Sequence, residues 1–165
     1  MGAETTGLTA RLLILLMVAN GMPILLRKLL GERFGWPVDG GCRFPDGRPW
    51  FGPSKTWRGL VCGIGAAAAA APLLGQPWQL GALVGAASLA GDLLSSFLKR
   101  RLGIVPSGMA LGLDQIPESL LPLLAVQGRF GLEWSYIAWF VIVFIVLELT
   151  LSAVLYRFRI RNRPY

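Results

Sequence analysis

The class of protein follows from one stretch of sequence, WSYIAWFVIVFIVLELTLSAVLY, which runs from Trp134 to Tyr156 and contains a single charged residue, Glu148. A transmembrane helix needs about 20 mostly apolar residues, and this stretch meets that requirement. The whole chain of 165 residues has the same character, with 54% hydrophobic and only 15% charged residues, where a soluble domain carries about 25% charged residues. The composition therefore predicts a small integral membrane protein and excludes a disordered chain.

Four other segments are candidates for membrane spans, although each is less apolar than the last one. The second contains an alanine run, the third contains Asp92, and the fourth is interrupted by Asp114, Glu118 and two prolines. A re-entrant or interfacial segment is the alternative for the fourth. We predict an all-α bundle of about five transmembrane helices in a single membrane-embedded domain, residues 1–165, with spans at Leu8–Leu26, Gly59–Gly75, Trp78–Leu98, Met109–Gln127 and Trp134–Tyr156.

The basic residues divide unevenly between the loops that these spans create. Fourteen of the 16 Lys and Arg residues fall in the long loop 27–58, in the loop after the third span and in the C-terminal tail, whereas only Arg11 and Arg129 fall on the other side. Basic loops stay in the cytoplasm. We therefore expect the chain to span a bacterial-type inner or cell membrane. Its N-terminus should lie outside the cell, and its C-terminus and long loop in the cytoplasm.

The long loop ends in Ser54-Lys55-Thr56, directly before the second span. Ser54 or Thr56 can cap the helix that starts there, and the backbone N–H groups at a helix start bind anions. Lys55 and Arg58 add positive charge, which favours a phosphate site at the membrane surface. No glycine stands immediately before Lys55, so the segment does not match the Walker motif. The alternative is an ordinary basic loop followed by a capped helix.

Acidic residues lie in the third and fourth spans, near the short basic loop that joins them. Asp92 shares a helical face with Lys99, and a carboxylate within a span is a functional hypothesis by default. Asp114 and Glu118 are four residues apart and repel each other unless a cation lies between them. The chain has no histidine, so these carboxylates favour a magnesium ion. The alternative is a structural Asp92 that pairs with a nearby lysine or arginine.

Several blocks of the sequence resemble the CDP-archaeol synthase family of small membrane cytidylyltransferases. The blocks have the order and spacing of that family and cover most of its length, and phosphatidate cytidylyltransferases share some of them more distantly. The blocks are Asn20–Pro23, Phe44–Arg48, Phe51–Gly59, Gly91–Asp92 with Ser96–Gly103, and Leu113–Gln115.

The resemblance implies an enzyme that joins CTP to a membrane lipid phosphate and releases diphosphate, with Mg²⁺ as cofactor. It also implies that Asp92 and Asp114 are carboxylates of the magnesium site and, together with Lys99, the catalytic residues. The residues expected to bind the nucleotide and its phosphates are Ser54, Lys55, Thr56, Arg58, Lys99 and Arg100.

One position departs from the family pattern. The family usually has a second Asp three residues after the first one in the block Leu113-Asp114-Gln115, and this position is Pro117 here, followed by Glu118. Either Glu118 supplies the missing carboxylate, or the metal site has fewer ligands, or the chain has an altered activity or a different lipid. The first option makes Asp92, Asp114 and Glu118 the predicted magnesium ligands.

Two other functions remain open on the sequence. A small oligomeric anion transporter or channel would also use buried acids and a basic vestibule, and a non-catalytic scaffold would keep a lipid-binding surface without the chemistry. The expected partners of the enzyme are CTP, a membrane lipid phosphate and membrane lipids, with a homo-oligomer left open and no nucleic acid.

Overall fold

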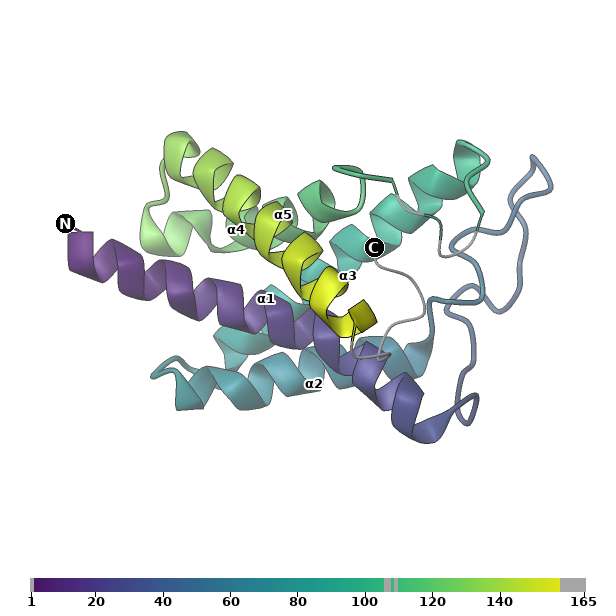
Figure 1. Ribbon diagram of the computed structural model, residues 1–165, viewed down its shortest axis with the longest axis horizontal. Helices are drawn as coiled ribbons and strands as arrows, with labels where there is room; N and C mark the ends of the chain where they lie inside the picture. The colour runs from purple at the N-terminus through teal and green to yellow at the C-terminus, as the bar shows by residue number, and fades with distance from the viewer. Residues whose placement is uncertain (1, 106–107, 109, 158–165) are drawn as a thin grey trace.

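The computed structural model describes residues 2–105, 108 and 110–157, which form five α-helices and their connections (Figure 1). Within these residues the β-structure is limited to two isolated bridges in the long connection between the first two helices. The prediction of an all-α bundle is therefore confirmed. The helices are α1 (Gly2–Leu30), α2 (Trp57–Leu73), α3 (Trp78–Arg101), α4 (Gln115–Phe130) and α5 (Trp134–Arg157).

The first helix is longer than the predicted first span. It continues past Leu26 and ends at Leu30, directly before Gly31, whose φ of 58° lies in the left-handed region that favours glycine. The connection between α1 and α2 therefore covers residues 31–56 rather than the predicted 27–58.

The fourth helix starts later than predicted, at Gln115, and the expected first residue of the span, Met109, lies outside the described residues. Side chains hold the preceding residues in a turn, because the Asp114 carboxylate accepts from the Ala110 amide at 3.1 Å and the Gln115 amide oxygen accepts from the Gly112 amide at 2.9 Å. These local contacts compete with helix formation. α4 is consequently shorter than α3 and α5.

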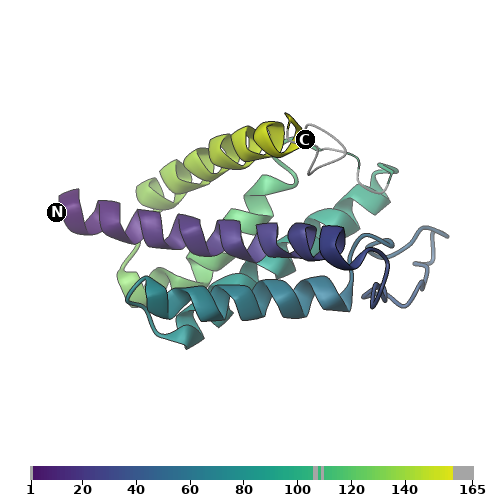
Figure 2. The same ribbon diagram turned by 60° about the horizontal axis from the view of Figure 1, so that its bottom comes forward.

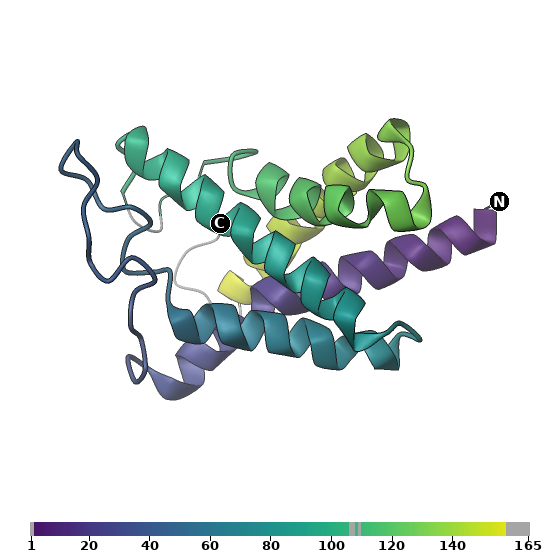
Figure 3. The same ribbon diagram turned by 180° about the vertical axis from the view of Figure 1, so that it is seen from behind.

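Small residues allow α2 and α3 to pack closely. A Cβ added to Gly63 of α2 would lie 2.8 Å from the Leu89 side chain of α3, and one added to Gly85 of α3 would lie 3.0 Å from the Ala67 Cβ of α2. Close backbone approach at small residues is a common form of helix packing in membranes. Figure 2 shows α1 between α2 and α5, and Figure 3 shows α3 between α2 and α4.

All five helices contribute to the apolar core, and most of its buried side chains come from α1, α4 and α5. Its buried side chains include Leu12 and Leu16 of α1, Val126 of α4 and Phe140 and Phe144 of α5. By contrast, the second half of α3 buries polar and charged side chains, which are Ser88, Ser95, Ser96, Lys99 and Arg100. Buried contacts in the core are therefore apolar, whereas those of the second half of α3 are largely polar.

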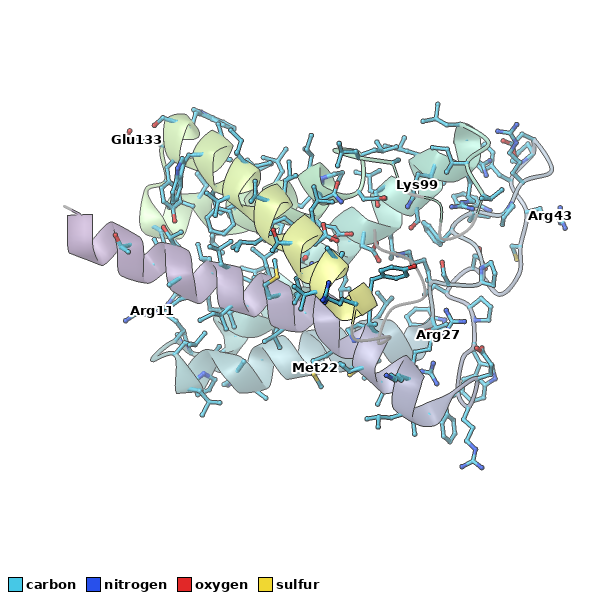
Figure 4. All side chains as sticks on the ribbon, in the orientation of Figure 1. Arg11, Met22, Arg27, Arg43, Lys99 and Glu133 are labelled. Carbon is cyan, nitrogen blue, oxygen red and sulfur yellow. The ribbon has the colours of Figure 1, made fainter. Side chains whose placement is uncertain are left out.

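Length and composition qualify three described helical segments as membrane spans: Thr6–Leu30, Trp78–Arg101 and Trp134–Val154. The charges follow the axis of the bundle, since Arg27, Arg43 and Lys99 lie toward one end and Glu133 lies at the other (Figure 4). Of the four arginines predicted in the C-terminal tail, only Arg157 falls within the described residues. The chain is an integral membrane protein, and its basic loops lie at the same end of the bundle.

Candidate functional site

The start of α4 lies against the middle of α3, rather than beside the end of that helix. The two backbones touch at Gly91, where an added Cβ would overlap the carbonyl of Pro117 and lie 2.7 Å from the Glu118 nitrogen. Gly91 therefore permits Glu118 to lie beside Asp92 in the middle of α3, while Asp114 lies nearer the basic end of that helix, beside Lys99.

Lys55 of the long connection and Asp92 of α3 form an ion pair at the centre of this region. The Lys55 ammonium donates to both carboxylate oxygens of Asp92 at 2.5 Å, and the two side chains are only 22% and 21% exposed. Burial by itself lowers the pKa of Lys55, but the charge and hydrogen bond of Asp92 outweigh it and raise that pKa above its usual 10.5. Lys55 is thus a fixed positive charge, and Asp92 does have the basic partner that a structural role requires.

A second ion pair, between Lys99 and Asp114, lies closer to the C-terminal end of α3. The ammonium of Lys99 contacts the Asp114 carboxylate at 2.6 Å and donates to the Gly108 carbonyl at 3.2 Å. Both side chains are largely buried, at 10% and 18% exposure. Lys99 therefore pairs across to the start of α4, although the sequence placed it on the same helical face as Asp92. As expected, Asp92 and Asp114 lie on neighbouring segments.

Glu118 brings a second carboxyl group to the Lys55–Asp92 pair. It is 7% exposed, it forms a side-chain hydrogen bond with Asp92, and Glu148 of α5 is close enough to add negative charge. Two carboxyl groups in such contact share a proton or a cation. The first of the three options for the Pro117 position, in which Glu118 supplies a carboxylate beside Asp92, is therefore compatible with the fold.

The donor set fits a magnesium ion that is completed by a ligand. Among the described residues, no three acidic, Cys or His side chains are gathered closely enough to hold a metal by themselves. Mg²⁺ is usually bound by one or two carboxylates, waters and substrate phosphates rather than by a protein cage. The adjacent carboxyl groups of Asp92 and Glu118 suit that mode. Asp114 belongs to the neighbouring ion pair with Lys99. The three-carboxylate magnesium site stays a prediction.

Arg100 offers unused hydrogen-bond donors at the same end of α3. Its Nη2 donates to the Val105 carbonyl at 3.2 Å, whereas Nε and Nη1 are buried and have no hydrogen-bond partner among the described residues. The residue is only 4% exposed. Buried guanidinium donors without partners are costly, and an anion such as a phosphate group would satisfy them.

The Ser54–Thr56 segment caps α2 in the expected way. The Thr56 hydroxyl accepts a hydrogen bond from the Gly59 amide at 3.2 Å, while Ser54 stands in the turn before it. Arg58 points elsewhere, because its Nη1 donates to the Gly31 carbonyl at 3.0 Å and to the Arg33 carbonyl. The structure thus brings Lys55, Asp92, Glu118, Lys99, Asp114 and Arg100 to one region and places the Arg58 guanidinium at the end of α1.

The sequence analysis missed a contact between the 43–49 turn and the end of α3. Arg101 contacts the Asp46 carboxylate at 2.7 Å, and its guanidinium lies 4.5 Å from the centre of the Phe44 ring. In return, Arg48 donates to the Arg100 carbonyl at 3.1 Å and to the Arg101 carbonyl at 2.6 Å. These contacts cover the last carbonyls of α3 and hold the turn over the end that carries Arg100.

We expect Arg101→Gln to release the 43–49 turn from α3. The variant loses the ion pair with Asp46, cation–π contacts with Phe44 and Phe97, and hydrogen bonds to the Pro49 and Arg48 carbonyls. The ion pair and each cation–π contact are worth about 0.5–1 kcal/mol. The Phe44 amide, which donates to the Arg48 carbonyl at 2.8 Å, should then exchange its hydrogen about ten-fold faster. Arg43→Gln is the matched control, since the Arg43 guanidinium donates to the Gly47 carbonyl within the 43–49 turn itself rather than to α3. Equal exchange in both variants would contradict the role given to Arg101.

Asp39 organises the rest of the long connection and was also missed. Its carboxylate accepts from the amides of Gly41, Phe51 and Gly52 at 2.9–3.0 Å. Partial burial raises the pKa of Asp39, but these hydrogen bonds outweigh that effect and lower it below its usual 3.8. An aspartate between turn residues could have signalled this role, because such side chains commonly bond to nearby backbone amides.

Comparison with known proteins gives consistent matches. A family model described as "CarS-like: CDP-archaeol synthase" matches residues 74–165. A CDP-archaeol synthase of Saccharolobus solfataricus is 31% identical over 154 residues, which is 90% of this chain and 89% of that protein. A CDP-archaeol synthase of Hyperthermus butylicus is 41% identical over 106 residues, which is 61% of this chain but only 60% of that protein.

A solved structure also resembles this fold. It belongs to a study of an intramembrane enzyme for archaeal membrane lipid biosynthesis, and it matches with a TM-score of 0.67 and 32% sequence identity. The match covers 84% of this chain and 91% of that one. The named relatives are archaeal, and the likeness extends over nearly the whole helical bundle.

Proposed function

Because the chain belongs to the CDP-archaeol synthase family, we propose that it is a membrane cytidylyltransferase that makes a CDP-activated lipid from CTP and a lipid phosphate. An oxygen of the lipid phosphate attacks the α-phosphorus of CTP. The bond from that phosphorus to the bridging oxygen breaks, and diphosphate leaves. Such a displacement needs positioning and charge stabilisation more than covalent help from the protein.

The observation that carries this proposal is the cluster of fixed charges between α3, the start of α4 and Lys55. Asp92 and Asp114 each form an ion pair with a lysine within 2.6 Å, so carboxylates and cations already lie together in this region. Arg100 adds buried donors without partners. A phosphate group of CTP would satisfy these Arg100 donors, and Mg²⁺ would balance the remaining charge of the triphosphate beside the carboxylates.

The proposed roles follow from these positions. Lys55, Lys99 and Arg100 bind the phosphates of CTP, while Ser54 and Thr56 form the turn beside the nucleotide. Mg²⁺, held by Asp92 and Glu118 with Asp114, would supply positive charge to the diphosphate that leaves. The 43–49 turn keeps the end of α3 in place and limits water at the phosphates.

A product assay tests the function directly. The purified chain is incubated with labelled CTP, Mg²⁺ and one lipid phosphate at a time, from a panel that includes an ester-linked diacylglycerol phosphate and an ether-linked archaeol phosphate. A labelled CDP-lipid supports the proposal, and the preferred lipid decides between a bacterial-type and an archaeal-type membrane. CTP-independent anion flux in vesicles would support a transporter instead, and neither signal would support a scaffold.

We further propose that the charge cluster faces the cytoplasm, with the N-terminus outside. A membrane-impermeant maleimide added to intact cells should then label Gln76→Cys in a chain without Cys42 and Cys62, because Gln76 lies in the short connection between α2 and α3. The native Cys42, which is exposed in the long connection, should stay unlabelled in Cys62→Ser until the membrane is opened. Labelling of Cys42 from outside would reverse the orientation.

A further inference from the structure

An apolar groove of about 380 Å³ lies between the end of α1 and the start of α2, apart from the charge cluster. One side chain in it is charged, that of Arg58. Two tryptophans in the groove are largely exposed, with 70% of Trp36 and 54% of Trp57 accessible. Its lining includes Leu30, Trp36, Trp57, Arg58, Val61 and Cys62.

The groove faces away from the catalytic region. Trp57, Arg58, Val61 and Cys62 follow the helical spacing that gives one face of α2. The packing face of the same helix lies elsewhere, because a Cβ added to Gly63 would lie 2.5 Å from the Ala19 carbonyl oxygen of α1 and 2.8 Å from the Leu89 side chain of α3. A molecule in the groove would therefore contact the outer surface of α1 and α2 rather than the Lys55–Asp92 pair.

The position of the groove indicates that it is exposed to the lipids of the membrane. It is built from the last turn of α1, the first turns of α2, and Phe34 and Trp36 of the connection between them, at the basic end of both helices. Tryptophans at helix ends are typical of the membrane–water interface. An apolar groove at this level, open to the outside of a membrane protein, is exposed to lipid chains, and lipid headgroups lie at the level of Arg58.

Arg58 supplies the charge that selects the occupant. Both of its contacts with the end of α1 use Nη1, so the rest of the guanidinium can face a headgroup phosphate. We propose that the groove binds one anionic phospholipid of the bilayer, with a chain along Leu30, Val61 and Cys62 and its phosphodiester at Arg58. This lipid is distinct from the substrate and would fix α1 to α2 next to Lys55.

Cys62 allows a test that needs neither CTP nor turnover. In Cys42→Ser it is the sole thiol of the chain, and its alkylation by a maleimide can be timed in dodecyl maltoside micelles. Added phosphatidylglycerol should slow the reaction in a saturable manner, whereas phosphatidylcholine should have little effect. Arg58→Gln in the same background should raise the phosphatidylglycerol concentration needed for half-protection about ten-fold.

Lys28→Gln is the matched control, because Lys28 is an exposed charge in the last turn of α1 and does not line the groove. It should keep the protection. Equal loss in Lys28→Gln and Arg58→Gln would show diffuse attraction to a basic surface and overturn the site. Protection by a phosphomonoester lipid alone would assign the groove to the substrate and overturn the proposal of a separate lipid. No protection by any lipid would also overturn it, whatever the product assay shows.

Discussion

Replacing Lys55 with methionine is expected to reduce cytidylyl transfer by more than about 100-fold and to lower the free energy of unfolding by about 3–5 kcal/mol. The activity falls because a charge that faces the phosphates is lost. The stability falls because the Asp92 carboxylate, 21% exposed and beside Glu118, loses the ammonium that holds both of its oxygens. Product formation and thermal unfolding in detergent measure the two effects separately.

The double variant Lys55→Met/Asp92→Asn separates the structural role from the catalytic one. Without the unpaired carboxylate it should regain most of the lost stability, but it should stay inactive. Arg27→Met is the control for a lost cation, since the Arg27–Glu32 pair is 56% and 84% exposed and should contribute less than about 1 kcal/mol. Full activity in Lys55→Met would remove this residue from the site, and an equally unstable double variant would contradict the pairing argument.

The pH dependence of the same pair has a definite sign. The folded-state pKa of Lys55 lies above its usual 10.5, so the contribution of its charge to stability is complete at neutral pH and is lost only as the pH rises through that raised pKa. The difference in unfolding free energy between the wild type and Lys55→Met should therefore stay constant from about pH 7 to pH 9. A difference that shrinks in that window would contradict the assignment.

The helices of this fold could be predicted because hydropathy and charge act over whole segments. A run such as residues 134–156 forms a helix in a membrane whatever its neighbours do, since every backbone group must be bonded within the segment. The start of α4 could not be predicted in the same way. It depends on the turn that Asp114 and Gln115 close, and on Gly91, whose missing side chain matters only once Pro117 lies against it.

The candidate site was likewise predictable only in part. Its residue types were visible in the sequence, because intramembrane acids near basic residues are rare and costly. The partners were not visible. Helical spacing put Asp92 and Lys99 on one face, but Lys99 pairs with Asp114 and leaves Asp92 to Lys55. Pairings across helices depend on the depth at which α4 meets α3, and no local pattern encodes that depth.

Glu118 follows Pro117, the position where the family usually has an acid. If it helps to hold Mg²⁺, Glu118→Gln should raise the Mg²⁺ concentration for half-maximal activity about ten-fold or more, and Asp114→Asn should do the same. Glutamine can still donate to Asp92 without a shared proton, so the fold without Mg²⁺ should be as stable as the wild type or more so. The stabilisation that Mg²⁺ adds should shrink in both variants.

Activity titrated against Mg²⁺ in Asp92→Asn, Asp114→Asn and Glu118→Gln decides the composition of the site. Glu133→Gln is the control, because it removes an exposed carboxylate at the opposite end of the bundle (Figure 4). If Glu118→Gln behaves like this control while the two aspartate variants are inactive, the metal has two protein carboxylates and Glu118 is structural. If all three variants are fully active, neither the magnesium site nor the cytidylyl transfer can reside here, because the only buried carboxylates held by lysines among the described residues would then be dispensable.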